Sequence, residues 1–432
     1  MQRDIYQKLL AWKSSPRRKP LILNGARQVG KTYALRHFAK AAYARHIYLN
    51  FEKDKELADY FEGSLDPKRL IQMLALHTDT DIEKCNTLLI FDEVQECPRA
   101  LNSLKYFCEE ANEYHVAAAG SLLGVKTARG AGFPVGKVNF LHLFPLSFFE
   151  FLSGIGKERL RSHLESLEKF VPIAAPIHQK LIEHLREYLF VGGMPEAVKT
   201  YIKHEKPALV REVQMEILDA YERDFAKHAP ISQLLKITAV WQQAHHQLAR
   251  ENKKFVYSAL RKSARGRDYE ESIAWLVEAG LLHKSTRIKK PGIPLSAYAE
   301  PHIFKLFLLD TGLLAAQAGL SAKALIHGSQ LFTEFKGALT ENYVAQELIC
   351  KRRSGLHYWS SQGTAEIDFV IEDEQSVYPL EVKAGASSKK KSLLVFGQKY
   401  RDAELSRASL MNLKKDGKIA NYPLYLVSRF PL

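Results

Sequence analysis

Eight consecutive residues near the N-terminus have the spacing of a phosphate-binding loop. Gly25 and Gly30, followed by Lys31 and Thr32, complete the pattern GxxxxGK[ST]. Glycines at these positions let backbone N–H groups curl around a phosphate, the lysine reaches the β and γ phosphates, and the threonine hydroxyl can ligate Mg²⁺. An apolar run before the loop and a helix-like pattern after it favour a functional P-loop over a chance match. The predicted ATP-binding residues are Gly25, Ala26, Arg27, Gln28, Val29, Gly30, Lys31 and Thr32.

Two acidic residues directly follow a second apolar run. In TLLIFDEVQ, the residues 88–91 precede Asp92 and Glu93. Such a run predicts a buried parallel strand, which delivers both carboxylates to the edge where α/β sheets bind ligands. We predict that Asp92 joins Thr32 around Mg²⁺, and that Glu93 is the catalytic residue that orients or deprotonates the attacking water. A run that ends in Asp-Glu is more often a plain strand end, but the P-loop upstream favours the functional interpretation.

The segment AEIDFVIEDEQSVYPLEVKAG, near the C-terminus, predicts a β-hairpin. Its strands are expected at 367–371 and 377–383, joined by a polar turn. Pairing of the two strands can bring Asp368 close to Glu381. Lys383 shares a face with Glu381, because side chains alternate along a strand.

Two further elements complete this second set of chemical groups. Alternation on the first strand predicts that Glu366 and Val370 share the face of Asp368. Upstream, GALTENYVAQELICKRR predicts a helix that begins near Thr340 and carries Glu341 in its first turn. The candidate catalytic residues of this set are Glu341, Asp368, Glu381 and Lys383.

A glutamate on a helix, an aspartate on one strand and E-x-K on the next resemble the active site of the PD-(D/E)xK nuclease superfamily. The resemblance implies that Asp368 and Glu381 hold Mg²⁺ together with the Val382 carbonyl. Lys383 would position the attacking water or stabilise developing negative charge. Glu341 would bind the metal through water or complete a second site. This chain departs from the superfamily motif at the first strand, where AEID stands in place of the leading PD. The alternative interpretation of the E-V-K triplet is a solvated pair of opposite charges at a strand edge, with no catalytic role.

Two more strands are predicted in the N-terminal region, at ARHIYLNFE (44–52) and YHVAAAGSLLG (114–124). A strand inserted between the P-loop strand and the Asp-Glu strand is typical of AAA+ and related NTPases, in which a polar residue on the next strand senses the γ-phosphate. By this resemblance, Ser121 has the sensor role. The alternative is a serine that serves only the turn after the strand.

Five segments, in order along nearly the whole chain, resemble prokaryotic AAA+ ATPases whose C-terminal half is a domain of unknown function called DUF4143. They are NGARQVGKT, LLIFDEVQECPRAL, AAGSLLG, LFPLSFFEFL (143–152) and YLFVGGMPEAV (188–198). In that family an arginine commonly stands before the strand that leads to the PLSF motif, whereas this chain has Lys137. An arginine finger can therefore not be assigned at that position. The candidates for an arginine finger elsewhere in the chain are Arg129 and Arg223.

The middle of the chain is mainly helical in pattern. Apolar residues at three-to-four spacing fill 156–235, and Gly192 with Gly193 predicts a hinge or cap there. The family resemblance implies a helical lid. Residues 236–325 are predicted to form a winged-helix-like module with three helices, the second at VYSALRKSA, and a basic hairpin.

The predicted helix and hairpin of this module are a familiar DNA-docking pair. The cations available for phosphates are Arg265, Arg267, Lys284, Arg287, Lys289 and Lys290. The alternative is a winged helix that only packs between two other domains.

Charge and composition limit the partners and the compartment. Nearly all of the net charge of +14 comes from residues 250–290 and 383–418, which favours a polyanion such as DNA, although lysine-rich faces are often only solubilising. No apolar run approaches the roughly 18 residues of a membrane span, so no membrane partner is expected. The four cysteines lack metal or disulfide spacing, which indicates a reducing, cytoplasmic compartment.

Together these observations predict an α/β fold with four domains. The expected division is an AAA+ P-loop ATPase domain at 1–155, a helical lid at 156–235, the winged-helix-like module at 236–325 and a nuclease-like domain at 326–432. We predict an enzyme that hydrolyses ATP with Mg²⁺, couples this to DNA binding or Mg²⁺-dependent cleavage, and can form a homo-oligomer. The alternatives are an ATPase whose nuclease-like domain is only a platform for DNA or protein, and a protein-remodelling or signalling ATPase.

Overall fold

The computed structural model describes residues 1, 3–121, 133–250, 254–261, 264–323, 333–352, 355–361, 365–385, 391–401 and 403–432. The chain divides into two compact units. The first comprises Met1–Phe144 and Glu278–Gly280, and the second comprises Pro145–Val277 and Leu281–Leu432. The lid, winged-helix and nuclease-like domains predicted from the sequence all fall largely within the second unit, and their boundaries stay a prediction.

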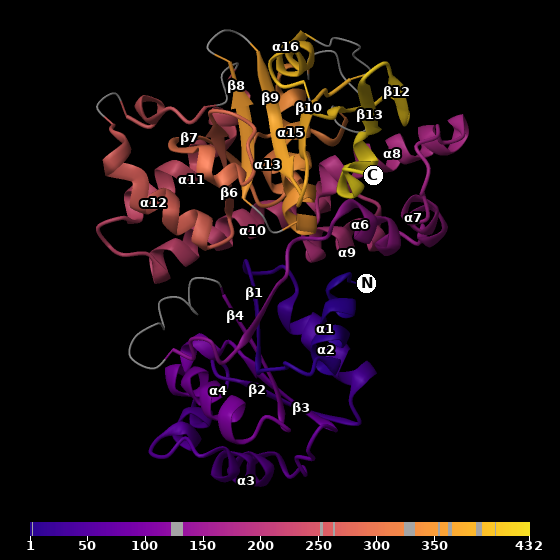
Figure 1. The fold of residues 1–432 in the computed structure, drawn as a ribbon. Helices are drawn as coiled ribbons and strands as arrows, with labels where there is room; N and C mark the ends of the chain where they lie inside the picture. Colours follow the sequence, from indigo (N-terminus) through magenta and orange to yellow (C-terminus); the bar gives the residue numbers. More distant parts are fainter. Residues whose placement is uncertain are drawn as a thin grey trace. The chain divides into compact units, whose positions relative to one another are not determined.

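The first unit is built on a five-stranded, entirely parallel sheet with the order β2-β3-β4-β1-β5 (Figure 1). The strands are β1 (Leu21–Gly25), β2 (Arg45–Asn50), β3 (Thr87–Asp92), β4 (His115–Ser121) and β5 (Asn139–His142). β1 and β3 are buried along their whole length, as their continuous apolar runs predicted. The predicted parallel α/β sheet is therefore confirmed, with Gly25 and Asp92 as the last residues of β1 and β3.

Helices connect the strands of the first unit. They are α1 (Ile5–Ser14), α2 (Lys31–Ala42), α3 (Pro67–Thr78) and α4 (Pro98–Glu110), with short 3₁₀ turns η1 (Lys55–Phe61) and η2 (Val94–Glu96). Phe91 of β3 lies in one core with Leu74 of α3 and Phe107 of α4. Burial of such side chains contributes about 25 cal/mol for each Å² removed from water, so this core holds the ends of β1 and β3 in place.

The second unit contains a mixed eight-stranded sheet with the order β12-β13-β11-β10-β9-β8-β6-β7. The strands are β6 (Leu282–Ile288), β7 (Ala299–Leu308), β8 (Leu356–Ser360), β9 (Glu366–Glu372), β10 (Val377–Val382), β11 (Leu405–Ser409), β12 (Lys414–Asp416) and β13 (Ile419–Pro423). β9 and β10 pair antiparallel with Phe369 opposite Leu380. The hairpin predicted for this segment is therefore present.

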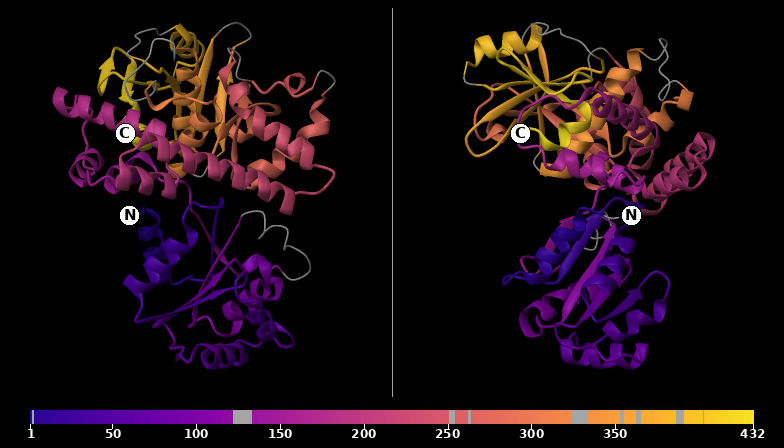
Figure 2. Two further views of the ribbon diagram at one scale, coloured as in Figure 1. Left: turned by 180° about the vertical axis from the view of Figure 1, so that it is seen from behind. Right: turned by 90° about the vertical axis from the view of Figure 1, so that its right-hand side faces the viewer.

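Helices gather around this sheet. They are α6 (Phe148–Gly154), α7 (Glu158–Glu165), α8 (Ala175–Val191), α9 (Pro195–His204), α10 (Pro207–His228), α11 (Leu234–Ala249), α12 (Gly266–Glu278), α13 (Thr311–Gln317), α15 (Thr333–Arg352) and α16 (Lys391–Lys399). The short 3₁₀ turns are η3 (Tyr257–Ala259), η4 (Leu295–Tyr298) and η6 (Leu424–Arg429). α8, α10 and α11 contact α13, and α15 contacts β7 and β10. Figure 2 shows the orange and yellow strands of this sheet with the magenta and pink helices of the same unit in two further views.

A β-bulge in β9 breaks the regular alternation that was predicted for this strand. Val370 pairs with His357. Ile367 pairs with Trp359, so two residues of β9 stand opposite one residue of β8. Residues paired directly share a face, as do residues two apart on one strand. Val370 therefore lies on the face of Ile367, and the prediction that it shares the face of Asp368 is wrong, because counting by twos misses an inserted residue.

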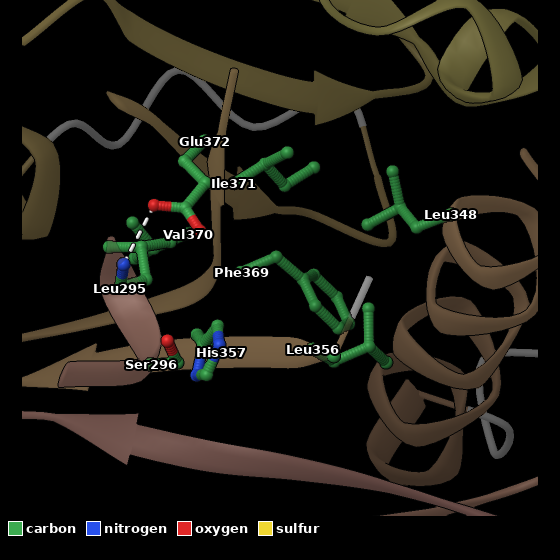
Figure 3. A pocket seen from close by; sticks show the side chains of 10 residues that line it. Leu295, Ser296, Leu348, Leu356, His357, Phe369, Val370, Ile371 and Glu372 are labelled. Carbon is green, nitrogen blue, oxygen red and sulfur yellow. Dashed lines mark hydrogen bonds between the residues drawn. The ribbon is translucent and has the colours of Figure 1, made fainter. Parts of the chain in front are cut away.

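The two faces of β9 pack against different helices. Ile367 and Val370 belong to one core with Phe396 of α16. On the other side, Phe369 and Leu348 of α15 both line a pocket of about 250 Å³, in which the ring of Phe369 lies beside Leu356 (Figure 3). Asp368 follows Ile367 and therefore lies on the face away from the α16 core, and the bulge places Phe369 on that same face.

The helix that carries Glu341 begins earlier than predicted. α15 starts at Thr333, so Glu341 lies in its interior and not in its first turn. Thr340, the predicted start, donates its hydroxyl to the Lys336 carbonyl over 2.7 Å, one helical turn back. A threonine can bond in this way inside a helix as well as cap one, which is why the start was misjudged.

The winged-helix-like module is not confirmed. The second predicted helix is a single 3₁₀ turn, η3, within the described residues 254–261. The predicted wing is the β6–β7 hairpin, but β6 also pairs in parallel with β8. The hairpin therefore extends the large sheet and buries Phe304, Leu306 and Leu308. Because apolar alternation looks alike in a free wing and in an added pair of strands, the sequence did not separate the two.

Candidate functional site

The P-loop backbone requires its glycines. A Cβ on Gly25 would lie 2.4 Å from the Leu143 carbonyl oxygen, because β5 and the residue after it run beside the end of β1. Gly30, directly before α2, has φ of 94°, in the left-handed region that favours glycine. Gln28 is also left-handed and exposed, whereas Ala26 and Val29 are buried. The loop thus has the tight turn and the helix N-terminus that bind phosphate in such folds.

Lys31 is the first residue of α2 and is buried. Its ammonium donates to the carbonyls of Gly25 over 3.0 Å and Ala26 over 2.9 Å. The lysine therefore lies along its own loop, where its charge is available to a phosphate held by the loop's N–H groups.

Thr32 and Asp92 are brought together across the end of the sheet. The Thr32 hydroxyl donates to Asp92 Oδ2 over 2.9 Å, and the Tyr48 hydroxyl donates to the same oxygen over 2.6 Å. Asn50 in turn donates to the Tyr48 oxygen. Burial and the hydrogen bond to Asp92 raise the pKa of Tyr48 to about 12, so it remains a donor at neutral pH.

The spacing of these two oxygens fits Mg²⁺. Neighbouring ligands of an octahedral Mg²⁺, each about 2.1 Å from the ion, lie about 3 Å apart. Thr32 Oγ1 and Asp92 Oδ2 are 2.9 Å apart, so one ion could contact both with little movement.

Glu93 has an unusual backbone and a fixed carboxylate. Its φ is 50°, a left-handed conformation that residues other than glycine seldom adopt outside functional sites and turns. The side-chain amide of Gln95 donates to Glu93 Oε2 over 2.5 Å. The carboxylate is thus oriented beside the Asp92 end of β3.

Sequence reasoning missed two residues that support this site. Tyr48 shares a face of β2 with His46 and Asn50, and the alternation of these polar residues with the buried Ile47 and Leu49 was the available signal. Arg3 is buried and donates to the carbonyls of Val29 over 3.0 Å and Phe144 over 2.6 Å. It ties the P-loop to the segment after β5, and no sequence pattern pointed to it.

The second set of candidates forms a carboxylate cluster in the other unit. Asp368 Oδ2 accepts a hydrogen bond from the Val382 N–H over 2.7 Å, so the hairpin does bring Asp368 to the Glu381–Lys383 segment. Glu381 is buried, and its Oε1 lies 2.9 Å from Lys383 Nζ. Burial lowers the pKa of Lys383, but the hydrogen bond and charge of Glu381, with further carboxylates nearby, raise it overall.

A lysine that the sequence analysis did not single out completes this cluster. Lys305 of β7 is 1% exposed, and its Nζ lies 3.7 Å from Glu341 Oε2 and 3.9 Å from Asp368 Oδ1. It also contacts Glu366 Oε1. Burial lowers the pKa of Lys305, but these three carboxylates outweigh it and raise the pKa above its ordinary value. Lys305 was missed because it lies in a strand that was predicted to be part of a separate module.

The fit of this cluster to a metal ion is partial. Within the described residues, no group of three or more His, Cys, Asp and Glu side chains has the spacing to hold a metal ion. Glu381 Oε2 is buried and accepts no hydrogen bond from the described residues. Asp368 and Glu381 could therefore supply two oxygen ligands, while Lys305 contacts Glu341.

Three regions of the sequence match family models. Residues 17–152 match the AAA domain, AAA_14. This match contains the whole P-loop site, and together they support an AAA-type P-loop ATPase domain. Residues 182–324 and 336–425 match two domains of unknown function, DUF8612 and DUF4143. The DUF4143 resemblance is thus confirmed, but none of these matches confirms a likeness to nucleases.

Comparisons with solved structures gave distant likenesses. The Walker-type ATPase PABY2304 of Pyrococcus abyssi has 12% identity and a TM-score of 0.47, covering 73% of this chain and 95% of that chain. The Orc1 protein of Aeropyrum pernix, solved in complex with DNA, has 12% identity, a TM-score of 0.29 and coverages of 73% and 90%. A variant of Thermotoga maritima RuvB has 16% identity, a TM-score of 0.29 and coverages of 65% and 89%. TM-scores below 0.5 carry no argument about function, and a comparison with curated proteins found no match.

The remaining candidates of the AAA-type domain are placed only in part. Ser121 pairs with Gly25 in the β1–β4 ladder, which sets its backbone beside the P-loop, but its side chain lies outside the described residues. Arg129 also lies outside them. Lys137 pairs with Glu109 of α4 over 2.8 Å. The arginine finger therefore stays unassigned, with exposed Arg223 of α10 as the described candidate.

The six predicted phosphate-binding cations differ in availability. Arg287 is held by Glu300 over 2.7 Å, and Lys284 is half-buried over the Phe304 ring. The exposed members are Arg265, Arg267, Lys289 and Lys290. Among the described residues, no helix is both long enough and apolar enough to cross a bilayer.

Proposed function

We propose that the AAA-type domain hydrolyses ATP. The observation that carries the proposal is the 2.9 Å contact of Thr32 with Asp92 beside a glycine-dependent loop and a buried lysine. Bound at these two oxygens, Mg²⁺ would neutralise charge on the β and γ phosphates. Lys31 binds the same phosphates, and the loop N–H groups orient them in line for attack.

Glu93 is the catalytic residue of this proposal. Its carboxylate, oriented by Gln95, accepts a hydrogen bond or a proton from the attacking water. Tyr48 is a positioning residue that acts through Asp92, and Ser121 is proposed as the γ-phosphate sensor. The cofactors are ATP and Mg²⁺.

Glu93→Gln tests this proposal. The variant is expected to bind a fluorescent ATP analogue as tightly as the wild type and to lose steady-state hydrolysis, because phosphate contacts persist while the group that acts on water is gone. Glu96→Gln, three residues further along, is the matched control and should keep turnover. Lys31→Ala should lose nucleotide binding itself. Hydrolysis by Glu93→Gln at the wild-type rate would remove Glu93 from the mechanism.

A second function is proposed for the carboxylate cluster: metal-dependent cleavage of nucleic acid. It is supported by the hydrogen bond from the Val382 N–H to Asp368, which joins the aspartate to the E-x-K segment. Asp368 and Glu381 would hold Mg²⁺, whose chemistry there is activation of water and screening of the scissile phosphate. Lys383 stabilises negative charge on the phosphate. DNA is the proposed partner, bound through the exposed cations Arg265, Arg267, Lys289 and Lys290, and ATP hydrolysis would be coupled to its binding or cleavage.

Asp368→Asn separates cleavage from binding. Supercoiled, linear, single-stranded and branched DNA are incubated with Mg²⁺ or Mn²⁺, with and without ATP. The variant is expected to lose cleavage, to keep or slightly raise DNA affinity and to keep ATP hydrolysis, because one negative charge facing phosphate is removed. Asp373→Asn, in the β9–β10 turn, is the control. If the wild type cleaves none of these substrates, the cluster belongs to a platform that binds DNA or protein, which is the competing proposal.

A further inference from the structure

The loop that joins β6 to β7, residues 289–298, presents apolar side chains beside two cations. It begins with Lys289 and Lys290, which are exposed. Ile293 and Pro294 follow and are exposed as well, and we call these two residues the apolar tip. A single exposed apolar residue is ordinary on a protein surface. An isoleucine and a proline close to two lysines, however, are the side chains with which proteins open base steps from the minor groove of DNA.

Contacts within the second unit fix the conformation of this loop. The Lys289 N–H donates to the Tyr298 carbonyl over 3.0 Å and closes the loop at its base. Gly292 packs against the Tyr298 ring, because a Cβ at this position would overlap that ring. Leu295 is buried, and its N–H donates to Glu372 over 2.7 Å (Figure 3). The apolar tip is therefore held in place before any partner binds, which lowers the entropy lost on binding.

The charges around the apolar tip favour an anionic partner. The Lys290 ammonium lies 4.7 Å from the centre of the Tyr298 ring, at the base of the loop. Glu300 of β7 lies near Lys289, but it accepts a hydrogen bond from Arg287 over 2.7 Å, which offsets its charge. A neutral apolar partner would leave the two lysines without anions. Duplex DNA supplies both phosphates for the lysines and an apolar gap between base pairs for the tip.

We propose that the apolar tip inserts into the minor groove of duplex DNA and kinks the duplex, while Lys289 and Lys290 contact phosphates. The inference rests on DNA as the proposed partner and adds the form in which the DNA is held. Pyrimidine–purine steps such as TA unstack most readily, so the preferred sites contain such a step. Selectivity then comes from the deformability of the DNA and not from contacts to base edges.

Parallel measurements of binding and bending test this proposal. The full-length protein is titrated into a duplex with donor and acceptor dyes at its ends and 2-aminopurine beside a central TA step. Ca²⁺ replaces Mg²⁺ so that the proposed cleavage does not intervene, and ATP is present or absent. Anisotropy reports binding, energy transfer reports bending, and 2-aminopurine fluorescence reports unstacking. The wild type is expected to raise all three signals, and to bind a duplex with a stiff A-tract at its centre several-fold more weakly.

Substitutions separate the tip from the cations. Ile293→Ser should lose the rise in energy transfer and in 2-aminopurine fluorescence at saturation, and should bind several-fold more weakly with an unchanged salt dependence. Lys289→Met and Lys290→Met should each lower the log–log salt slope by about 0.9 and still bend the duplex at saturation. Ile202→Ser on α9 is the matched control, because Ile202 is 41% exposed and Ile293 is 46% exposed. This control should keep all signals.

The possible failures are distinguishable. If the wild type binds the duplex at saturation with unchanged energy transfer and 2-aminopurine fluorescence, the wedge is refuted and DNA remains the partner. Equal signals from Ile293→Ser and wild type place any bend elsewhere and also refute it. Tighter binding to single strands than to duplex refutes it too, because a single strand has no base pairs to open. If the wild type binds no duplex, DNA fails as the proposed partner and the wedge fails with it.

Discussion

The hydroxyl of Thr32 and the carboxylate of Asp92 are joined by a 2.9 Å hydrogen bond, although 60 residues separate them in the chain. The contact exists because β1 and β3 are parallel strands that end at the same edge of the sheet, with β4 between them. Asp92 Oδ2 also accepts from Tyr48 of the neighbouring strand β2. The position of this one oxygen therefore depends on three strands and on the start of α2.

Tyr48→Phe should weaken nucleotide binding only when Mg²⁺ is present. The hydroxyl orients Asp92, and loss of such a supporting hydrogen bond lowers metal affinity about 10- to 100-fold. Binding of a fluorescent ATP analogue is measured with Mg²⁺ and with EDTA. The EDTA titration should match the wild type. Tyr106→Phe on α4 is the control, and equal loss in both buffers would mean that Tyr48 only stabilises the fold.

Gly25→Ala should destabilise the first unit and abolish nucleotide binding. The added Cβ would lie 2.4 Å from the Leu143 carbonyl oxygen, and backbone must shift to relieve the overlap. Overpacking of this kind costs about 1–3 kcal/mol. Thermal unfolding and nucleotide titration measure the two effects. Gly355→Ala controls for the general effect of replacing a glycine, because a Cβ at that position would have its nearest neighbouring atom 3.9 Å away. Similar stability of the Gly25→Ala and Gly355→Ala variants would contradict the close contact at Gly25.

Gln95→Leu should slow hydrolysis without changing nucleotide affinity. The amide donates to Glu93 over 2.5 Å, and a hydrogen bond to a charged group contributes about 1.5–3 kcal/mol. If the oriented carboxylate is needed in the transition state, kcat should fall about 10- to 100-fold. Steady-state hydrolysis gives kcat, and equilibrium binding gives the affinity. A fall in affinity with unchanged kcat would place Gln95 in nucleotide binding instead.

Stability of the second unit should depend on pH through Asp310. This carboxylate is fully buried between the N–H groups of Gly193 and Leu313, and burial raises its pKa to about 6. The folded state therefore holds a proton that the unfolded state, with an ordinary pKa near 3.8, has already released. This residue's contribution to the free energy of unfolding is greatest below about pH 4 and falls as pH rises through 6.

Asp310→Asn isolates that contribution. The difference in free energy of unfolding between wild type and Asp310→Asn should shrink between pH 4 and pH 7. In this range unfolding of the wild type releases the proton held by Asp310, and the asparagine variant has no such proton to release. Urea unfolding across this range measures it. The exposed Asp219→Asn is the control, and its difference from wild type should not follow the same course. If the difference in free energy of unfolding between wild type and Asp310→Asn stays constant from pH 4 to pH 7, the Asp310 carboxylate is charged in the folded protein over that whole range.

The sequence by itself determined the features that depend on neighbouring residues. The P-loop is a run of eight residues whose backbone conformation follows from its glycines, and continuous apolar runs identified β1 and β3. The β9–β10 hairpin could be predicted from the sequence, because a polar turn separates two segments rich in apolar residues. In each case the signal and the structure are local, so no distant contact had to be known.

Tertiary structure decided which side chains meet these local elements. Lys305 contacts Glu366 from 61 residues away, and β7 joined the large sheet where a separate module was expected. The bulge in β9 changed which residues face α15, because an extra residue shifts the register of everything beyond it. Strand partners and sheet register depend on packing between distant segments, and a single sequence carries no local pattern for either.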